Sequence, residues 1–326
     1  MKYIIGVDVG ATNTRIALAN QKGDILDKVR FRTPSKGDRL TIADTIRKTI
    51  MEKYGKYIDK VVGIGIGTIG PIDLKKGMVV NAPNNPIRTF DLREPLMEWL
   101  GKPVYVANDC VAAVWGEYLF GAGKGYQNIV YITLSTGIGG GVIVNGVLLL
   151  GKQGNAHEIG HMVIDYNSKF KCGCGGYGHW EAYASGANIP RFAKYLLETE
   201  NIPEEFRETD LYKLIMNNEA TTEKIFEYAK KGDKLALFII DKVSQANIVG
   251  VANTINVYDP EVVTIGGSVA LYNEELIIKP IIENVIKHLV TTPPKIMKTP
   301  LGDDVVLKGA IALIVNTPST LKEFQE

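Results

Sequence analysis

Histidine and cysteine side chains gather in one short stretch of the sequence, residues 154–181, GNAHEIGHMVIDYNSKFKCGCGGYGHWE. It holds all of the chain's histidines but one, and two of its three cysteines. Imidazole nitrogen and thiolate sulfur are ligands that zinc prefers, and a closed set of four is typical of a structural site. Inert thiols, a surface histidine and a buried, hydrogen-bonded histidine are the alternative. We interpret the stretch as a zinc loop whose ligands are His161, Cys172, Cys174 and His179.

Two carboxylates bracket this cluster and fit no role as zinc ligands. Glu158 lies before the first expected ligand of the cluster, and Glu181 ends the stretch. Carboxylates accept hydrogen bonds from hydroxyl groups, so both are candidates for binding a sugar. The alternative for each is a solvated position on the surface, the commoner place for a single glutamate.

Two glycine- and threonine-rich turns each connect a pair of apolar strands. Residues 8–15 have the sequence DVGATNTR, and residues 134–141 have the sequence LSTGIGGG. Backbone N–H groups exposed in such turns, together with the hydroxyl groups, can cradle phosphate oxygens. Asp8 is placed to hold Mg²⁺ through its water shell, because this ion takes few carboxylates; a plain β-turn is the alternative for the first motif. The candidates for phosphate contact are Asp8, Gly10, Ala11, Thr12, Asn13, Arg15, Thr136 and Gly137.

A third glycine motif ends an apolar strand at residues 262–268, VVTIGGS. Gly266 and Gly267 leave a flat space where adenine or ribose could lie, although a tight turn into a helix is the alternative. The chain has no G-x-x-x-x-G-K-S/T motif, and its first two glycine turns lie between strands, unlike those of dinucleotide-binding motifs. The three motifs together resemble the nucleotide cleft of the actin-like ATPase superfamily, which includes sugar kinases.

Asp109 is the candidate for the catalytic base. It follows the short apolar strand at residues 103–107, and Asn108 stands beside it. A carboxylate in this position can accept the proton of a sugar hydroxyl that attacks a phosphate, and the amide can bind a neighbouring hydroxyl. An ordinary helix N-cap is the alternative for Asp109.

The elements that must position these residues follow an α/β pattern. A strand, a glycine and threonine turn and a second strand occur at residues 3–18 and again at residues 130–144, which predicts two related halves. Residues 41–57 carry apolar side chains at helical spacing, which predicts an amphipathic helix. We expect the last helix, which begins near residue 305, to pack against the first half.

Length and composition limit the possible classes of protein. The chain has 326 residues, enough for two domains at roughly 150 residues each. Its net charge of +1 provides no general attraction to nucleic acid or membranes. We expect no signal peptide, and no apolar run reaches the roughly 18 residues needed to span a membrane. Three cysteines without a disulfide pattern favour a cytoplasmic location.

The sequence resembles the ROK family of sugar kinases and repressors over nearly its whole length. The motifs that carry the resemblance are, in order, DVGATNTR, GIGTIGPID, APNNP, NDCVAAVWGE, LSTGIGGG, EIGH, CGCGGYGHWE and VVTIGGS. The resemblance implies an actin-like ATPase (ribonuclease H-like) fold of two α/β domains with the active site in the cleft between them. We expect a small domain at residues 1–114, completed by the C-terminal helix at 306–326, and a large domain at residues 115–305. The large domain would carry the zinc loop and the helices of a homodimer interface.

The same resemblance assigns roles to residues. Asp109 is similar to the family's base, and Gly67 and Thr68 would line the sugar pocket. His161 would bind both sugar and zinc. The family's sugar contacts correspond to Asn84, Asn108, Glu158, His161 and Glu181.

Two positions within residues 154–181 depart from the family pattern. His179 stands in place of the third zinc cysteine, and His157 stands in place of a small residue before the EIGH motif. The first changes the metal ligand set to two cysteines and two histidines, and the second adds bulk beside the expected sugar contacts.

We therefore predict a hexokinase or glucokinase that uses ATP and Mg²⁺ to phosphorylate the 6-hydroxyl of a hexose. An N-acetylglucosamine or N-acetylmannosamine kinase, or a fructokinase, would share every motif. A sugar-responsive repressor is the alternative of another class; it is disfavoured because no room for a helix-turn-helix segment precedes Asp8, and no basic stripe is present.

Overall fold

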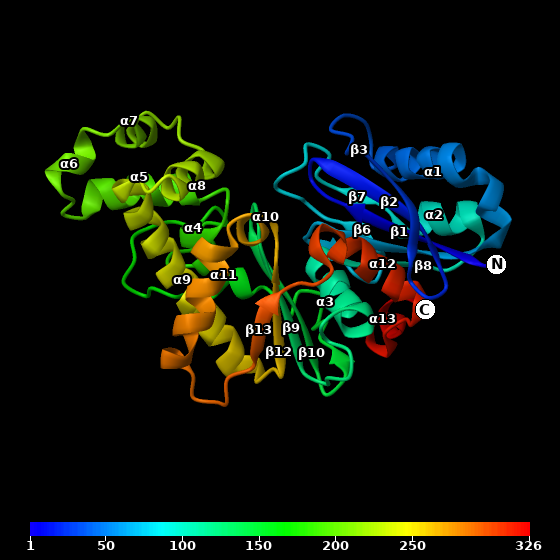
Figure 1. Ribbon diagram of the computed structural model, residues 1–326. Coiled ribbons are helices and arrows are strands. Elements are labelled where there is room, and N and C mark those ends of the chain that lie inside the picture. Colours follow the sequence, from blue (N-terminus) through cyan, green and yellow to red (C-terminus); the bar gives the residue numbers. More distant parts are fainter. The chain divides into compact units, whose positions relative to one another are not determined.

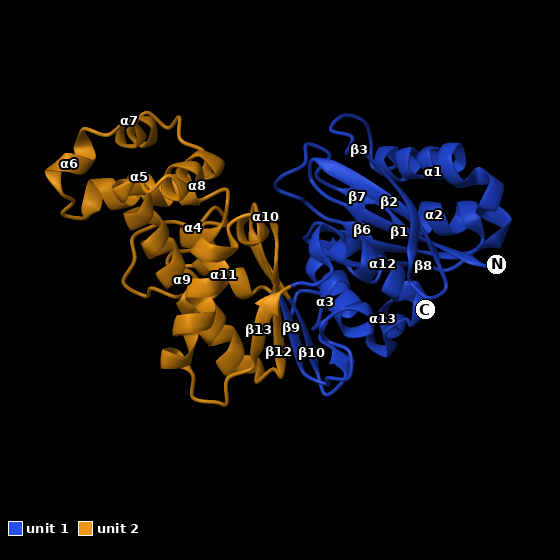
Figure 2. Ribbon diagram, viewed as in Figure 1, with its two compact units in different colours: residues 1–131, 141–157, 299–326 blue, residues 132–140, 158–298 orange.

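Two compact units make up the chain, and the computed structural model describes all residues from 1 to 326 (Figures 1 and 2). The first unit consists of Met1–Tyr131, Gly141–His157 and Thr299–Glu326. The second consists of Ile132–Gly140 and Glu158–Lys298. This division differs from the expected domains, because it assigns residues 115–131 and 141–157 to the first unit. Both divisions assign the C-terminal residues to the first unit. The units are defined by compactness alone, so the predicted domain boundaries stay a prediction.

The first unit is built on a five-stranded sheet with the order β3-β2-β1-β4-β8. β1 pairs antiparallel with β2 and parallel with β4, and β4 pairs parallel with β8. A second, three-stranded sheet has the order β5-β6-β7. The strands are β1 (Tyr3–Val9), β2 (Asn13–Asn20), β3 (Ile25–Arg32), β4 (Val61–Thr68), β5 (Ile72–Asp73), β6 (Met78–Val79), β7 (Phe90–Asp91) and β8 (Val104–Asn108).

Helices of this unit pack on the five-stranded sheet. The amphipathic helix predicted near residues 41–57 is confirmed as α1 (Thr41–Tyr54), which buries Ile42, Ile46, Ile50 and Tyr54. The strand β4 carries glycines at alternate positions, and a Cβ atom at Gly65 would lie 1.8 Å from the carbonyl oxygen of Ala310 in α12. Glycine at this position therefore lets the C-terminal helix lie directly on the sheet. The other helical segments of the unit are η1 (Gly55–Lys60), α2 (Arg93–Leu100), α3 (Asp109–Phe120), η4 (Gly302–Asp304), α12 (Val305–Val315) and α13 (Ser319–Gln325).

The expected single C-terminal helix at 306–326 is divided in two. α12 ends at Val315 and α13 begins at Ser319. Pro318 lies between them, and proline both lacks a backbone N–H group and disfavours helical geometry in the residue before it.

A second five-stranded sheet repeats the strand order of the first. Its order is β11-β10-β9-β12-β13, so the strands correspond one by one to β3-β2-β1-β4-β8. This arrangement agrees with the predicted duplication of the strand, turn and strand unit. The strands are β9 (Ile129–Leu134), β10 (Ile138–Val144), β11 (Val147–Leu148), β12 (Val262–Gly266) and β13 (Lys295–Lys298).

The rest of the second unit is mainly helical. α9 is long and apolar enough to cross a membrane by length and hydropathy alone, but 61% of its most apolar window is buried inside the protein. That burial is typical of a core helix. The helical segments are η2 (Ile159–His161), α4 (Trp180–Ala184), α5 (Ile189–Thr199), α6 (Glu204–Arg207), α7 (Asp210–Met216), α8 (Thr222–Lys230), α9 (Lys234–Tyr258), α10 (Ser268–Leu271), α11 (Glu274–Asn284) and η3 (Val285–His288).

Candidate functional site

Three neighbouring strands of the first unit bring predicted site residues to one edge of its sheet. Asp8 of β1 is in register with Gly67 of β4, and Thr68 of β4 is in register with Asn108 of β8. Because these strands are parallel, their carboxyl ends meet at the same edge, where ligands of open α/β sheets bind. The structure thus places the expected Mg²⁺ carboxylate and the expected sugar contacts on adjacent strands. The hydroxyl group of Thr68 is buried there without a hydrogen-bond partner.

Asp109 begins helix α3 directly after β8 ends at Asn108. The N-cap of α3 is Asn108, whose side chain accepts a hydrogen bond from the backbone N–H of Cys110 at 2.9 Å. One oxygen of the Asp109 carboxylate also accepts from this N–H group, at 2.8 Å. Since the cap position belongs to Asn108, the interpretation of Asp109 as an ordinary N-cap loses support. Asp109 is half-buried, as a base at the edge of a sheet must be to meet a substrate.

Asp8 forms an ion pair with the residue opposite it on β2. Its Oδ2 atom accepts hydrogen bonds from Arg15 Nε at 2.9 Å and from Arg15 Nη2 at 2.6 Å. Burial raises the pKa of Asp8, while the adjacent guanidinium opposes that increase. Arg15 also donates to the backbone carbonyl of Asp303 at 2.7 Å. Two of the predicted cofactor contacts, Asp8 and Arg15, are therefore paired with each other.

The first turn, residues 10–12, is held by two side chains that the sequence analysis did not select. Thr33 Oγ1 donates to the carbonyl of Gly10 at 2.7 Å, and Asn85 Nδ2 donates to the carbonyl of Ala11 at 3.2 Å. Asn85 is buried, whereas its neighbour Asn84, the predicted sugar contact, is exposed. No sequence signal distinguishes the two asparagines, because burial depends on how the loop folds onto the first turn.

The second turn, residues 135–137, connects β9 to β10 in the second unit. The backbone N–H of Ser135 donates to the carbonyl of Gly137 at 3.0 Å, which closes the turn. Thr136 is exposed at its tip. The third glycine motif lies beside this turn, because the hydroxyl oxygens of Ser135 and Ser268 are 3.2 Å apart. Gly267 has a φ of +87°, and a Cβ atom there would lie 2.4 Å from the carbonyl oxygen of Leu134, so glycine is required. The two expected nucleotide motifs of this unit are thus in contact.

The four predicted metal ligands come together in the second unit. The ligand atoms of His161, Cys172, Cys174 and His179 all lie within 4.8 Å of one another. The Nδ1 atoms of His161 and His179 are 3.4 Å apart, and Cys174 Sγ is 3.2 Å from His179 Nδ1. Tetrahedral zinc with bonds of about 2.0–2.3 Å separates its ligands by roughly 3.3–3.8 Å, so this donor set fits the ion.

Protonation in the metal cluster also fits a zinc site. Burial raises the pKa of Cys172 to about 11, so the thiol alone is protonated at neutral pH and needs a nearby cation to ionise. Burial, followed by the proximity of His161, lowers the pKa of His179 and favours the neutral imidazole that binds metals.

Both predicted sugar-binding carboxylates lie near ligands of the metal cluster. Glu158 is exposed, and its Oε2 atom is 3.8 Å from Nε2 of His161. Nδ1 of His161 is directed at the cluster, so Nε2 is left on the side of this carboxylate. Glu181 is half-buried, and its Oε2 atom accepts a hydrogen bond from the backbone N–H of Ile138 at 3.0 Å.

His157, the bulky departure from the family pattern, lies in the first unit. Its ring is buried, and Nε2 is 2.8 Å from the carbonyl oxygen of Gly154. The ring thus donates a hydrogen bond within its own loop and closes the turn immediately before Glu158.

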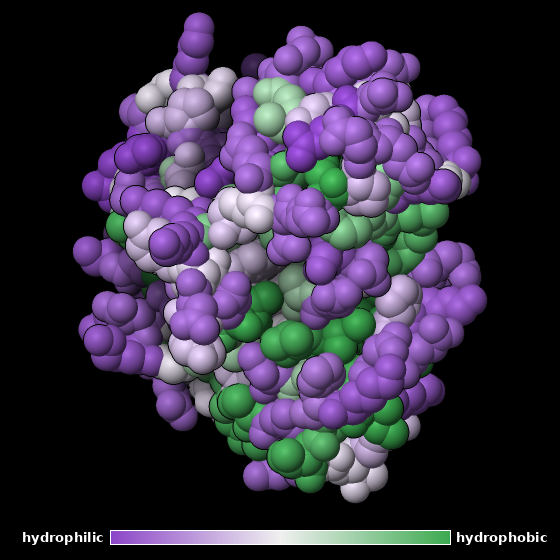
Figure 3. Space-filling model, turned by 90° about the vertical axis from the view of Figure 1, so that its left-hand side faces the viewer, coloured by the Kyte–Doolittle hydropathy of each residue, from purple (hydrophilic) through white to green (hydrophobic).

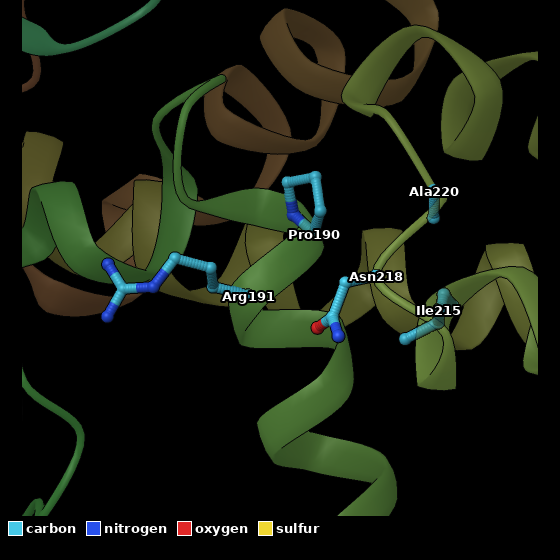
Figure 4. Close-up of a pocket in the computed structure, with 5 residues that line it drawn as sticks. All are labelled: Pro190, Arg191, Ile215, Asn218 and Ala220. Carbon is cyan, nitrogen blue, oxygen red and sulfur yellow. The ribbon is translucent and has the colours of Figure 1, made fainter.

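A small cavity of about 140 Å³ in the second unit contains no predicted site residue (Figure 4). The guanidinium of Arg191 points away from Asn218, and it donates instead to Asn188 and to the carbonyl of Lys171 (Figure 4). The cavity therefore lacks the converging polar groups of a ligand site. Its lining residues are Pro190, Arg191, Ile215, Asn218 and Ala220.

Comparison with known proteins gives the class of this chain. Residues 4–317 match the ROK family. The chain is 43% identical to a glucokinase of Pyrobaculum calidifontis over 325 residues, covering 99% of both chains. It is 38% identical to a glucokinase of Aeropyrum pernix, covering 99% of this chain and all of the relative. A ROK family glucokinase from Streptomyces griseus, solved in complex with glucose and AMPPNP, superposes with a TM-score of 0.75 at 32% identity, covering 95% of this chain and 98% of the other.

The two α/β units have the actin-like ATPase fold of ROK hexokinases and glucokinases, as predicted. The chain belongs to the ROK family.

Proposed function

We propose that the protein is an ATP-dependent glucokinase that transfers the γ-phosphate of ATP to the 6-hydroxyl of glucose. Its similarity over the full length to glucokinases supports this activity. The observation that carries the proposal is the placement of Asp109 at the carboxyl end of β8, two strands from Asp8 in the same sheet.

The proposed chemistry assigns proton transfer to Asp109. Its carboxylate takes the proton of the attacking hydroxyl, while Asn108 binds a neighbouring hydroxyl. Backbone N–H groups and hydroxyls of the first and second turns hold the phosphates, so that positioning and electrostatics provide most of the rate. Further sugar contacts are assigned to Gly67, Thr68, Asn84, Glu158, His161 and Glu181.

We propose two metal ions with different tasks. Mg²⁺ near Asp8 would neutralise charge on the phosphates; a single carboxylate suits this ion because it keeps several of its waters. Zinc bound by the Cys2His2 cluster would be structural, since four protein ligands leave no open position.

A panel of sugars tests the proposed substrate. The purified protein is assayed with ATP and Mg²⁺ against glucose, mannose, fructose, N-acetylglucosamine and N-acetylmannosamine, and kcat/KM is compared. We expect the highest value for glucose. A higher value for an N-acetylated sugar or for fructose would replace glucokinase by the corresponding kinase, and turnover of none of them would refute a sugar kinase of this range.

We also propose that the protein forms a homodimer through an apolar patch on the second unit. The patch consists of Val257, Ile282, Ile286 and Val290, which are exposed by 65%, 46%, 57% and 87%. The side chain of Asn256 fixes its geometry, donating to the carbonyl of His288 at 2.9 Å and accepting from the N–H of Val290 at 3.0 Å. Hydrophobic residues gather in the lower half of the face shown in Figure 3. Grouped exposed apolar side chains mark interaction surfaces, and one patch on each copy suits a two-fold dimer.

A cytoplasmic location remains part of the proposal. It is supported by three cysteines that form no disulfide, as expected in a reducing compartment. Fractionation of cells with an antibody to the protein tests it.

A further inference from the structure

We propose that Glu181 is a positioning residue for the second turn, and that the metal cluster controls nucleotide binding through the helix that carries Glu181. This inference rests on the proposed function, because it takes residues 135–137 to be a phosphate-binding turn. Glu181 and the metal site, which were expected to serve sugar binding, would then also take part in nucleotide binding.

The direct link is the hydrogen bond from the backbone N–H of Ile138 to Oε2 of Glu181, at 3.0 Å. A Cβ atom at Gly137 would lie only 2.8 Å from the same oxygen, so the carboxylate rests against the turn itself. A hydrogen bond to a charged group is stronger than one between two neutral groups. The orientation of the peptide that follows the turn therefore depends on this carboxylate.

The residues that follow α4 bind two backbone carbonyl groups of the turn. The N–H of Gly186 donates to the carbonyl of Ser135 at 2.7 Å, and the N–H of Ala187 donates to the carbonyl of Thr136 at 3.0 Å. The segment 181–187 thus satisfies one N–H and two carbonyl groups of residues 135–138. Both carbonyl groups therefore already have partners, whereas Thr136 itself is exposed to solvent.

The metal cluster fixes the beginning of the same segment. α4 has only five residues, and its N-cap residue is the predicted ligand His179. The N–H of Trp180 donates to the carbonyl of Met162 at 3.0 Å, next to the ligand His161. A helix this short has little stability of its own, so its position depends on such anchors.

The far side of α4 is held by packing that does not involve the metal. Trp180 is fully buried, and its Nε1 donates to Oδ1 of Asn247 at 2.9 Å. Trp180 therefore holds one side of α4 in place. The metal cluster then determines how α4 is rotated about this side chain, and the rotation sets the positions of Glu181 and of residues 186–187.

The decisive experiment measures nucleotide binding apart from catalysis. The dissociation constant of AMPPNP with Mg²⁺ is measured without sugar for the wild type, Glu181→Ala, Glu181→Gln and the control Glu200→Ala, an exposed glutamate of the same unit. We expect Glu181→Ala to weaken binding on the order of 10-fold, because a charged hydrogen bond at the turn is lost. Glu181→Gln keeps an oxygen acceptor for Ile138 and should restore most of the affinity, whereas Glu200→Ala should change nothing.

Hydrogen exchange provides a second measurement that needs no ligand. Peptides covering residues 135–138 should exchange faster in Glu181→Ala, and also in wild-type protein after a chelator has removed the metal. Unchanged AMPPNP affinity and unchanged exchange in Glu181→Ala, together with a raised KM for glucose, would overturn the proposal and leave Glu181 a sugar contact only. Unchanged exchange at residues 135–138 after chelation would overturn the role of the metal. If wild-type protein phosphorylates no sugar, the proposed function fails, while the exchange data still judge the link between Glu181 and the turn.

Discussion

The side-chain amide of Gln325 hydrogen-bonds both backbone polar groups of Val106. Its Oε1 accepts from the N–H of Val106 at 3.0 Å, and its Nε2 donates to the carbonyl of Val106 at 2.7 Å. Val106 lies in β8, an edge strand of the first sheet, so the amide takes the place of a further strand. The same Nε2 also donates to the carbonyl of Leu74 at 2.8 Å. A residue near the end of the chain thus completes the strand that leads into Asn108 and Asp109.

Gln325→Leu should destabilise the protein and slow catalysis. The substitution leaves two backbone groups of Val106 buried without partners, which costs about 1–3 kcal/mol for each group. Loss of order in β8 should also displace Asp109 and lower kcat. Urea unfolding measures the first effect and a coupled glucokinase assay the second. The matched control is Gln21→Leu at an exposed turn; equal losses in both variants would contradict the role of Gln325.

Asp109→Asn should abolish most of the turnover while leaving sugar binding intact. The amide has nearly the same shape but cannot accept the proton, and a general base contributes roughly 10²–10⁴-fold to the rate. The assay compares kcat with the dissociation constant of glucose, measured by calorimetry. Near wild-type kcat in a variant that binds glucose normally would eliminate Asp109 as the base.

Protein purified without added metal should contain about one zinc ion per chain, held by its four ligands. Cys174→Ala should lose most of this zinc, because a three-ligand site binds the ion more weakly. Cys110→Ala removes a buried cysteine outside the cluster and should keep the metal. Mass spectrometric metal analysis gives the ratio. A ratio near zero in the wild type, with thermal stability unaffected by a chelator, is incompatible with the proposed site.

Glu117 should make the stability of the protein depend on pH. Its side chain is fully buried on α3, where it accepts hydrogen bonds from the hydroxyl of Thr299 and from the N–H of Ala122. Burial raises its pKa above the ordinary value of 4.5, against the opposing effect of these hydrogen bonds. The folded state therefore holds this proton more tightly than the unfolded state. The resulting stability is present below pH 4.5 and is lost as pH rises through the folded pKa.

Glu117→Gln removes this titration and isolates its effect. The free energy of unfolding of the wild type, relative to that of the variant, should fall as pH increases from about 4 to 8. Denaturant unfolding across this range measures the difference, and the exposed Glu219→Gln should show no such trend. If the difference in the free energy of unfolding stays constant with pH, Glu117 has the same pKa in the folded and the unfolded state.

Ile286→Glu should dissociate the proposed homodimer. A charge in the centre of an apolar interface is unpaired there, and the loss of a central contact weakens association on the order of 100-fold. Light scattering after size-exclusion chromatography measures the mass across a dilution series. Leu26→Glu provides a control, since Leu26 is exposed by 50% and lies outside the apolar patch. Equal masses for the wild type and Ile286→Glu, or a monomeric wild type, would refute the patch as a dimer surface.

Much of the fold could be predicted because its signals are local. Alternating glycines and isoleucines in β4, the helical spacing in α1 and the two glycine turns are all written within short windows of sequence. The four metal ligands could also be selected from the sequence, since they fall within 19 residues and metal chemistry limits the choice of side chains. The break at Pro318 was missed, although proline itself provides the signal.

Only the tertiary structure decided which side chains support the site. Asn84 and Asn85 are chemically identical neighbours, yet only Asn85 is buried and holds the carbonyl of Ala11. The bond from Ile138 to Glu181 joins residues 43 positions apart, and the bonds from Gln325 reach 219 positions back to Val106. The residue types by themselves determined the available chemistry, namely metal ligands, a base and phosphate-binding turns. Contacts between distant segments were decided by packing, because hydrogen-bond geometry depends on positions in space that no local pattern of residues specifies.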